Sequence, residues 1–194
     1  MAKWLIFALF FCISCGGNVF KFREVSHPID TNLIHINIYG APVLWRKEKI
    51  PLNIHISEDL SEHQRETVVS AIKYWNSELD FKLFKIDPKK NSDITLGLKI
   101  IGKSKNDLRY LGVCSKTFDY VSETQMYINK AEIYLGYDLW TKEVYKTTLH
   151  ELGHAIGLGH SDSLESIMFP QPMASTSFLT DGQKRALWLF YGTN

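Results

Sequence analysis

The sequence of 194 residues lacks several features that mark particular protein classes. Its 22 basic and 21 acidic side chains leave a formal net charge of +1, so no basic surface for nucleic acid or an anionic membrane is indicated. Two of its three cysteines lie near the N-terminus, so no disulfide framework follows, and we interpret Cys114 as a small buried apolar side chain. There is no internal repeat or low-complexity tract, and the length suits one domain.

The N-terminus carries a single lysine followed by an apolar run over residues 4–13, which is too short to span a bilayer. This order is typical of a signal peptide, so we expect export, to a secreted or cell-envelope location. The run ends in "CISCGGN", which resembles a bacterial lipobox, although Cys12 stands where that motif prefers leucine. We expect a signal peptide over 1–14, a lipid anchor on Cys15 and a linker over 15–41. Cleavage nearby without lipidation, or a buried N-terminal helix, are the alternatives.

Hydrophobic periodicity predicts the elements of the remaining chain. Alternating apolar residues indicate strands over 50–57, 93–101 and 126–136, with shorter ones over 80–86, near Cys114 and within 33–39. An amphipathic helix is expected over 61–79, where Ser61 and Gln64 have capping-box spacing and the apolar stripe comprises Val68, Ile72, Trp75 and Leu79. Two more helices are expected over about 138–156 and 179–192. This order of elements indicates a mixed α/β arrangement with a twisted sheet.

The stretch "TLHELGHAIGLGHSDSLESIMFP", residues 148–170, contains three closely spaced histidines. On a helix, His150 and His154 lie about 40° apart on one face, while apolar residues fill the opposite arc. His-Glu-x-x-His is a zinc-binding pattern, because two neutral imidazoles reach one ion and the glutamate points at the remaining coordination site. For these five residues alone, the alternative is an ordinary helix with a histidine-rich polar face.

The glycines that follow strengthen the metal interpretation. Gly157 falls where the helix must stop, and a left-handed backbone there favours glycine, while Gly159 loosens the same turn. The reversal would bring His160 back as a third ligand and leave one position open. Three protein ligands with an open position are typical of catalytic zinc, whereas structural zinc sites are closed by four.

The segment "HELGHAIGLGHS" resembles the metzincin pattern H-E-x-x-H-x-x-G-x-x-H at every fixed position. Ser161 and "SIMFP" resemble the matrixin branch of that clan, peptidase family M10, which includes the matrix metalloproteinase catalytic domains. "LWRKEKIPLNIHI" and "LTDGQKRALWLFYG" are similar to the matrixin first strand and last helix. The resemblance covers residues 42–194. It implies an α+β metzincin (zincin-like) domain, with a twisted, mainly parallel sheet, three helices, an active-site helix and a Met-turn.

By this resemblance the chain is expected to be an exported zinc-dependent metalloendopeptidase. Glu151 would be the general base, and one Zn²⁺, polarising the scissile carbonyl and lowering the pKa of its bound water, would be held by His150, His154 and His160. Met168 would pack beneath the metal without binding it, and Pro170 would enter the wall of the specificity pocket. Protein or peptide substrates would lie extended and antiparallel along an edge strand at Leu111, Gly112, Val113 and Cys114.

Several matrixin features are missing from the sequence. No histidine occurs between His63 and His150, the region in which matrixins hold a second, structural zinc. The Asp-rich calcium loops are also absent, so calcium binding is left open. In the last helix, Gly182 and Gln183 replace the paired aspartates of matrixins.

We therefore expect one zinc ion, the catalytic one. We also expect no nucleic-acid partner, and we expect a monomer. The alternative function is a zinc-binding surface lipoprotein or binding scaffold that does not cleave. The intact Glu151 argues against this alternative, since a protein without catalysis needs no base beside the first ligand.

Overall fold

The structure is a computed structural model that describes residues 10–12, 34–37, 39–89, 91–102, 110–175 and 178–192. Its elements, in chain order, are β1 (Phe10–Cys12), β2 (Val43–Leu44), a 3-10 turn (Lys47–Lys49), β3 (Leu52–Ile56), α1 (Glu62–Ser77), β4 (Phe84–Ile86), β5 (Ile94–Lys99), β6 (Gly112–Ser122), β7 (Gln125–Gly136), α2 (Thr141–Ala155) and α3 (Asp181–Tyr191). The predicted lipid anchor at Cys15 and most of the predicted signal and linker segments lie outside the described residues.

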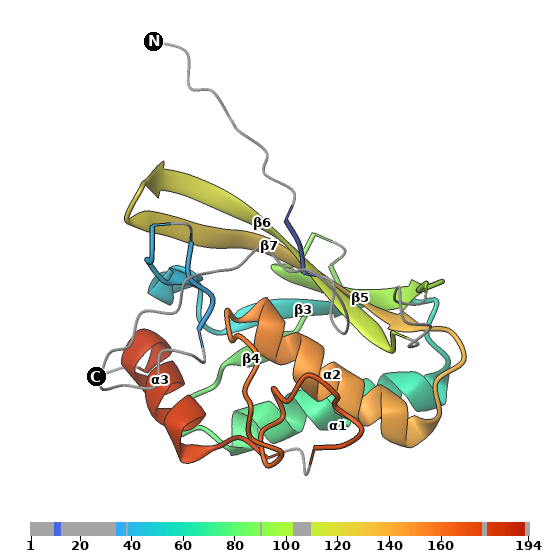
Figure 1. Ribbon diagram of the computed structural model, residues 1–194. Helices are drawn as coiled ribbons and strands as arrows, with labels where there is room; N and C mark the ends of the chain where they lie inside the picture. The colour runs from blue at the N-terminus through green and yellow to red at the C-terminus, as the bar shows by residue number, and fades with distance from the viewer. Residues whose placement is uncertain are drawn as a thin grey trace.

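All of these strands belong to one sheet, ordered β1-β6-β7-β5-β3-β4, with β2 also pairing with β7 (Figure 1). The neighbours β4, β3, β5 and β7 run parallel, and β2 is parallel to β7. Strand β6 is antiparallel to β7, and β1 is antiparallel to β6. A mainly parallel sheet with three helices in the described chain agrees with the α+β metzincin fold expected from the sequence.

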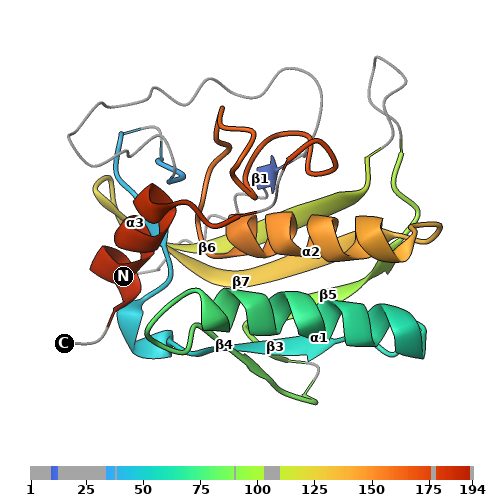
Figure 2. The ribbon, with the colours of Figure 1, turned by 90° about the horizontal axis from the view of Figure 1, so that it is seen from below.

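Helices α1 and α2 lie side by side on one face of the sheet, and α3 lies beyond the C-terminal end of α2 (Figures 1 and 2). The predicted capping box of α1 is present, with Ser61 accepting a hydrogen bond from the Gln64 amide. Trp75 of the predicted apolar stripe is fully buried and donates its indole N–H to the carbonyl oxygen of Leu149 at 3.2 Å. This bond joins α1 to the turn of α2 that carries the first predicted ligand.

The strand predictions were wrong in three places. Among the described residues of 33–39 no strand of the sheet is found: the chain reverses at Gly40 (φ +80°), and these residues make single bridges, Ile34 to Leu158 and Ile36 to Pro42. The strand expected over 80–86 is reduced to β4, since the Asn76 side chain of α1 accepts from the amides that precede and begin it. The short strand expected near Cys114 is instead the 11-residue β6.

The C-terminal end of α2 is fastened by residues distant in sequence. The Trp45 indole N–H donates to the carbonyl oxygen of Ala155 at 2.7 Å, and the hydroxyl of Tyr191 in α3 donates to that of Ile156 at 2.7 Å. The same hydroxyl accepts from the backbone N–H of Trp45 at 3.2 Å. A helix leaves its last carbonyl groups without partners inside the helix, so these bonds determine where the helix end lies.

Candidate metal centre

His150 and His154 project from one face of α2, as their four-residue separation requires. Both are buried, their rings meet edge to face with centroids 4.6 Å apart, and their Nε2 atoms are 3.1 Å apart. The opposite face of α2 packs into the core through Leu149 and Leu152. Burial, together with the neighbouring His160 imidazole, lowers the pKa of His150 to about 3, so this ring is neutral at neutral pH. Neutral imidazole is the form that binds metals.

The turn after α2 has the backbone conformation predicted for it. Gly157 has a φ of +99°, and the amide of Leu158 donates to the carbonyl oxygen of Gly153 at 2.9 Å, which closes the helix end. A Cβ at Gly157 would lie 2.8 Å from the carbonyl oxygen of Val43, so the close approach of β2 also requires glycine. The reversal places Nε2 of His160 3.2 Å from Nε2 of His154.

The three imidazoles fit one metal ion. Their ligand atoms all lie within 4.8 Å of one another, and no other group of His, Cys, Asp or Glu in the described ranges is placed to hold a metal. Zinc–nitrogen bonds of about 2.0–2.1 Å in a tetrahedral site separate neighbouring donors by about 3.3 Å, close to the 3.1 and 3.2 Å found here.

The outer ring nitrogens are tied to the backbone. Nδ1 of His150 donates to the carbonyl oxygen of Ile167 at 2.8 Å, and Nδ1 of His154 donates to that of Leu158 at 3.0 Å. These bonds hold the proton on Nδ1, so that the unprotonated Nε2 atoms face the common centre. The donor set therefore matches zinc in chemistry, spacing and protonation.

Glu151 lies beside this centre with its side chain 1% exposed, and its Oε2 atom has no hydrogen-bond partner. Burial raises the pKa of Glu151 to about 8, and the positive charge of Lys116 opposes that rise. The carboxylate reaches β6 at Gly112, where a Cβ would be 3.0 Å from Oε1. A buried carboxyl group with a free oxygen, beside three imidazoles that fit one metal ion, is suited to proton transfer.

Met168 is fully buried and packs against Gly153 of α2, the residue before His154. Its turn is fixed by the Ser161 amide, which donates to the carbonyl oxygen of Met168 at 2.9 Å. Pro170 follows two residues later and is half-buried. Gln183, noted in the sequence only as a replacement for an aspartate, is fully buried and donates to the Ser166 hydroxyl at 2.7 Å, so it braces the same turn.

The predicted substrate strand corresponds to the start of β6, with Leu111 just before it. Gly112 contacts Glu151, whereas Val113 is half-buried and Cys114 fully buried. In this structure β1 pairs antiparallel with β6 over Cys114 to Lys116, so this part of the predicted substrate strand has another strand beside it. An extended segment of the chain itself thus lies along β6 over the stretch from which Lys116 reaches the backbone of His154.

Two polar residues of the centre were missed by sequence reasoning. Lys116 occupies an inward position of β6 and donates to the carbonyl oxygen of His154 at 2.9 Å. His35, expected in a linker, places Nε2 3.4 Å from Nδ1 of His154. The burial of Lys116 could have been predicted, since it alternates with Cys114 and Phe118 on one face of the strand. The sequence around His35 contains no pattern that predicts its contact with His154.

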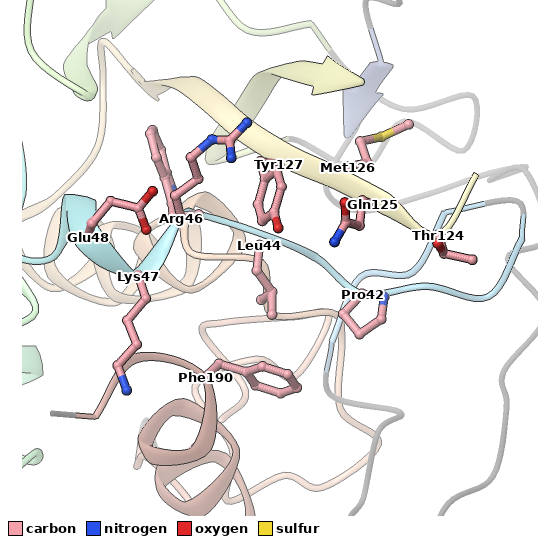
Figure 3. Close-up of a pocket in the computed structure, with 11 residues that line it drawn as sticks. Pro42, Leu44, Arg46, Lys47, Glu48, Thr124, Gln125, Met126, Tyr127 and Phe190 are labelled. Carbon is pink, nitrogen blue, oxygen red and sulfur yellow. The ribbon is translucent and has the colours of Figure 1, made fainter. Parts of the chain in front are cut away.

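A surface groove elsewhere in the structure is lined by none of the predicted site residues. It is bounded by Leu44 of β2, Tyr127 of β7 and Phe190 of α3, and the Arg46 guanidinium lies 4.1 Å from the centre of the Tyr127 ring (Figure 3). The Arg46 side chain already stacks on the Tyr127 ring that forms one side of this groove. We therefore regard the histidine cluster, and not the groove, as the candidate reactive centre.

Comparison with known proteins agrees with this geometry. Matrix metalloproteinase-19 of Mus musculus is 30% identical over 138 residues, which are 65% of this chain and 24% of that protein. The chain thus spans about a quarter of the length of that relative. The model of the peptidase M10 family, matrixin, matches residues 44–191, which include α1, α2, the three histidines, the Met168 turn and α3. The chain belongs to the matrixin family of metallopeptidases.

Proposed function

We propose that this chain is an exported zinc-dependent endopeptidase that hydrolyses peptide bonds in proteins. The observation that carries the proposal is the convergence of three neutral imidazoles beside a buried glutamate with an unpartnered oxygen. His150, His154 and His160 would hold one zinc ion. When bound, zinc supplies Lewis-acid chemistry, which polarises the scissile carbonyl group and makes the attacking water more acidic.

Glu151 is the proposed general base. Its carboxylate takes one proton from the water as the water oxygen attacks the carbonyl carbon, and it then delivers that proton to the leaving amine nitrogen. The role requires the ionised carboxylate, which nearby positive charge favours. Lys116 provides one such charge, and a cation held by the imidazoles would add another. Gly112 supports the role, because the absence of a side chain there lets the carboxylate approach β6.

Substrates are proposed to bind as an extended strand antiparallel to β6 near Gly112, Val113 and Cys114, through main-chain hydrogen bonds. The pairing of β1 with β6 supports this proposal, since it places an extended chain there in the same orientation. Pro170, after the Met168 turn, is the proposed wall of the specificity pocket.

Export with lipidation at Cys15 is part of the proposal. Within the described residues, no helix is both long and apolar enough to cross a membrane. Cleavage before Cys15 would remove β1 together with the leader and leave the edge of β6 free for substrate. Incorporation of labelled palmitate in a bacterial host, lost in Cys15→Ser, is the expected result. Label that survives the substitution would exclude this anchor.

Metal analysis and proteolysis of the purified chain test the enzymatic proposal. We expect one zinc per chain after gel filtration, loss of that zinc in His160→Ala, and casein hydrolysis that a chelator blocks and added zinc restores. Bound zinc without hydrolysis would instead favour a non-cleaving zinc-binding scaffold. A chain without zinc at these histidines would end the proposal, and two zincs per chain, with one retained in His160→Ala, would reveal an additional site.

A further inference from the structure

The last carbonyl groups of α2 and its turn are each bound by a different part of the chain. Four oxygens in succession, from His154 to Gly157, accept hydrogen bonds from the Lys116 side chain, the Trp45 indole, the Tyr191 hydroxyl and the His35 backbone amide. Three of these donors are neutral, and only Lys116 is charged. Lys116, the charged donor, binds the backbone of His154, a proposed zinc ligand. We therefore ask whether it does more than satisfy a carbonyl group at the end of α2.

Lys116 is 5% exposed and is the only lysine or arginine among the buried residues that the structure describes. A buried ammonium group is costly unless it has strong partners. Its ammonium group donates to the carbonyl oxygen of His154 at 2.9 Å, and it also interacts electrostatically with Glu151. A cation at a helix C-terminus is favoured by the helix dipole, so the position suits the charge. The ammonium group thereby anchors the ligand-bearing end of α2 to β6.

His35 contacts the same ligand from the other side. Its ring centre is 5.6 Å from that of His154, and its Nε2 is 3.4 Å from the Nδ1 atom that donates to Leu158. Because Nδ1 of His154 donates to Leu158 at 3.0 Å, the His35 nitrogen can only accept at this edge of the ring, over a longer distance. His35 is held in place by its own backbone, which donates to the carbonyl oxygen of Gly157 at 2.8 Å and accepts from the Val43 amide at 2.8 Å.

Resting on the proposed zinc site, we propose that Lys116 and His35 are positioning residues for His154. Lys116 fixes the backbone of this ligand, and His35 fixes the outer edge of its ring, so that Nε2 points at the metal. Partners behind a metal-binding histidine commonly change metal affinity by about 10–100-fold when removed. Neither residue would touch the metal or the substrate.

The test uses Lys116→Met, which keeps the unbranched stem of the side chain without the charged amino group, and His35→Phe, which keeps a ring without nitrogen. The matched controls are Lys130→Met on the neighbouring strand β7, whose lysine is partly exposed, and His63→Phe on α1, whose histidine is exposed. The measurements on the full chain are the zinc dissociation constant by chelator competition, the absorption spectrum of the cobalt-substituted protein, and the melting temperature without metal.

We expect both variants to raise the zinc dissociation constant by about 10–100-fold and to alter the cobalt spectrum, with both controls unchanged. A merely structural role would lower the metal-free melting temperature without changing affinity or spectrum, and that result overturns the inference. If Lys116→Met does not fold, His35→Phe decides by the same criteria. If the wild type binds zinc and hydrolyses protein, and the variants bind zinc with the same dissociation constant, only this inference is removed. A wild type without zinc removes the proposed function as well.

Discussion

Gly112→Ala is the substitution that most directly tests the contact between β6 and the proposed base. A Cβ at this position would overlap Cγ2 of Thr147 and lie 2.9 Å from Cγ and 3.0 Å from Oε1 of Glu151. Thr147 and Glu151 are each 1% exposed, so neither side chain can swing into solvent. The added methyl group must therefore displace α2 or rotate the glutamate.

The size of the effect follows from these distances. Carbon atoms in ordinary contact lie about 3.5–4.0 Å apart, so Cγ of Glu151 must move by roughly 0.6–1 Å. A misplacement of about 1 Å can cost on the order of 10²-fold in rate, and we expect a fall in kcat/KM of about 10–100-fold. Overpacking costs about 1–3 kcal/mol, and the reduced freedom of the unfolded chain offsets about 0.4–1 kcal/mol of it. The expected net loss of unfolding free energy lies between about 0 and 2.6 kcal/mol, with a middle value of about 1.3 kcal/mol.

The assay combines the hydrolysis rate of labelled casein, the zinc content and the urea unfolding midpoint. Gly136→Ala, at the end of β7, is the matched control, because its Cβ would meet no atom closer than 3.5 Å. Adding Thr147→Ala to Gly112→Ala should recover stability but not activity, since the contact with Glu151 remains. If Gly112→Ala equals Gly136→Ala in both rate and stability, the proposed crowding of the base is refuted.

Three further substitutions test other parts of the centre. Glu151→Ala should retain one zinc per chain and lose about 10²–10⁴-fold in hydrolysis rate; near wild-type rates with zinc bound would remove it from the mechanism. Gly157→Ala should lower stability by more than about 1 kcal/mol and weaken zinc binding, because its φ is +99°, and zinc affinity equal to that of Gly136→Ala would contradict this. Trp45→Phe leaves the carbonyl oxygen of Ala155 without its donor and should cost about 1–3 kcal/mol in urea unfolding; an unchanged midpoint would show that this bond contributes nothing.

Features that depend on residues close together in the chain could be predicted from the sequence. The four-residue spacing of His150 and His154 dictated that they share a helix face, and the glycine at 157 indicated the left-handed turn that follows. The capping box of α1 and its buried Trp75 were predictable for the same reason. Helix periodicity, caps and tight turns are local physics, and a single sequence contains all the information they need.

The distant residues that surround the histidines became known from the folded structure alone. Lys116 is 38 positions from His154 and His35 is 119 positions from it, and neither has a local pattern that names its partner. The covering of β6 by β1, the room that Gly112 leaves for Glu151 and the support of the Met168 turn by Gln183 likewise depend on pairings across the fold. Such contacts are set by strand register and helix packing over long sequence separations, which one sequence does not specify.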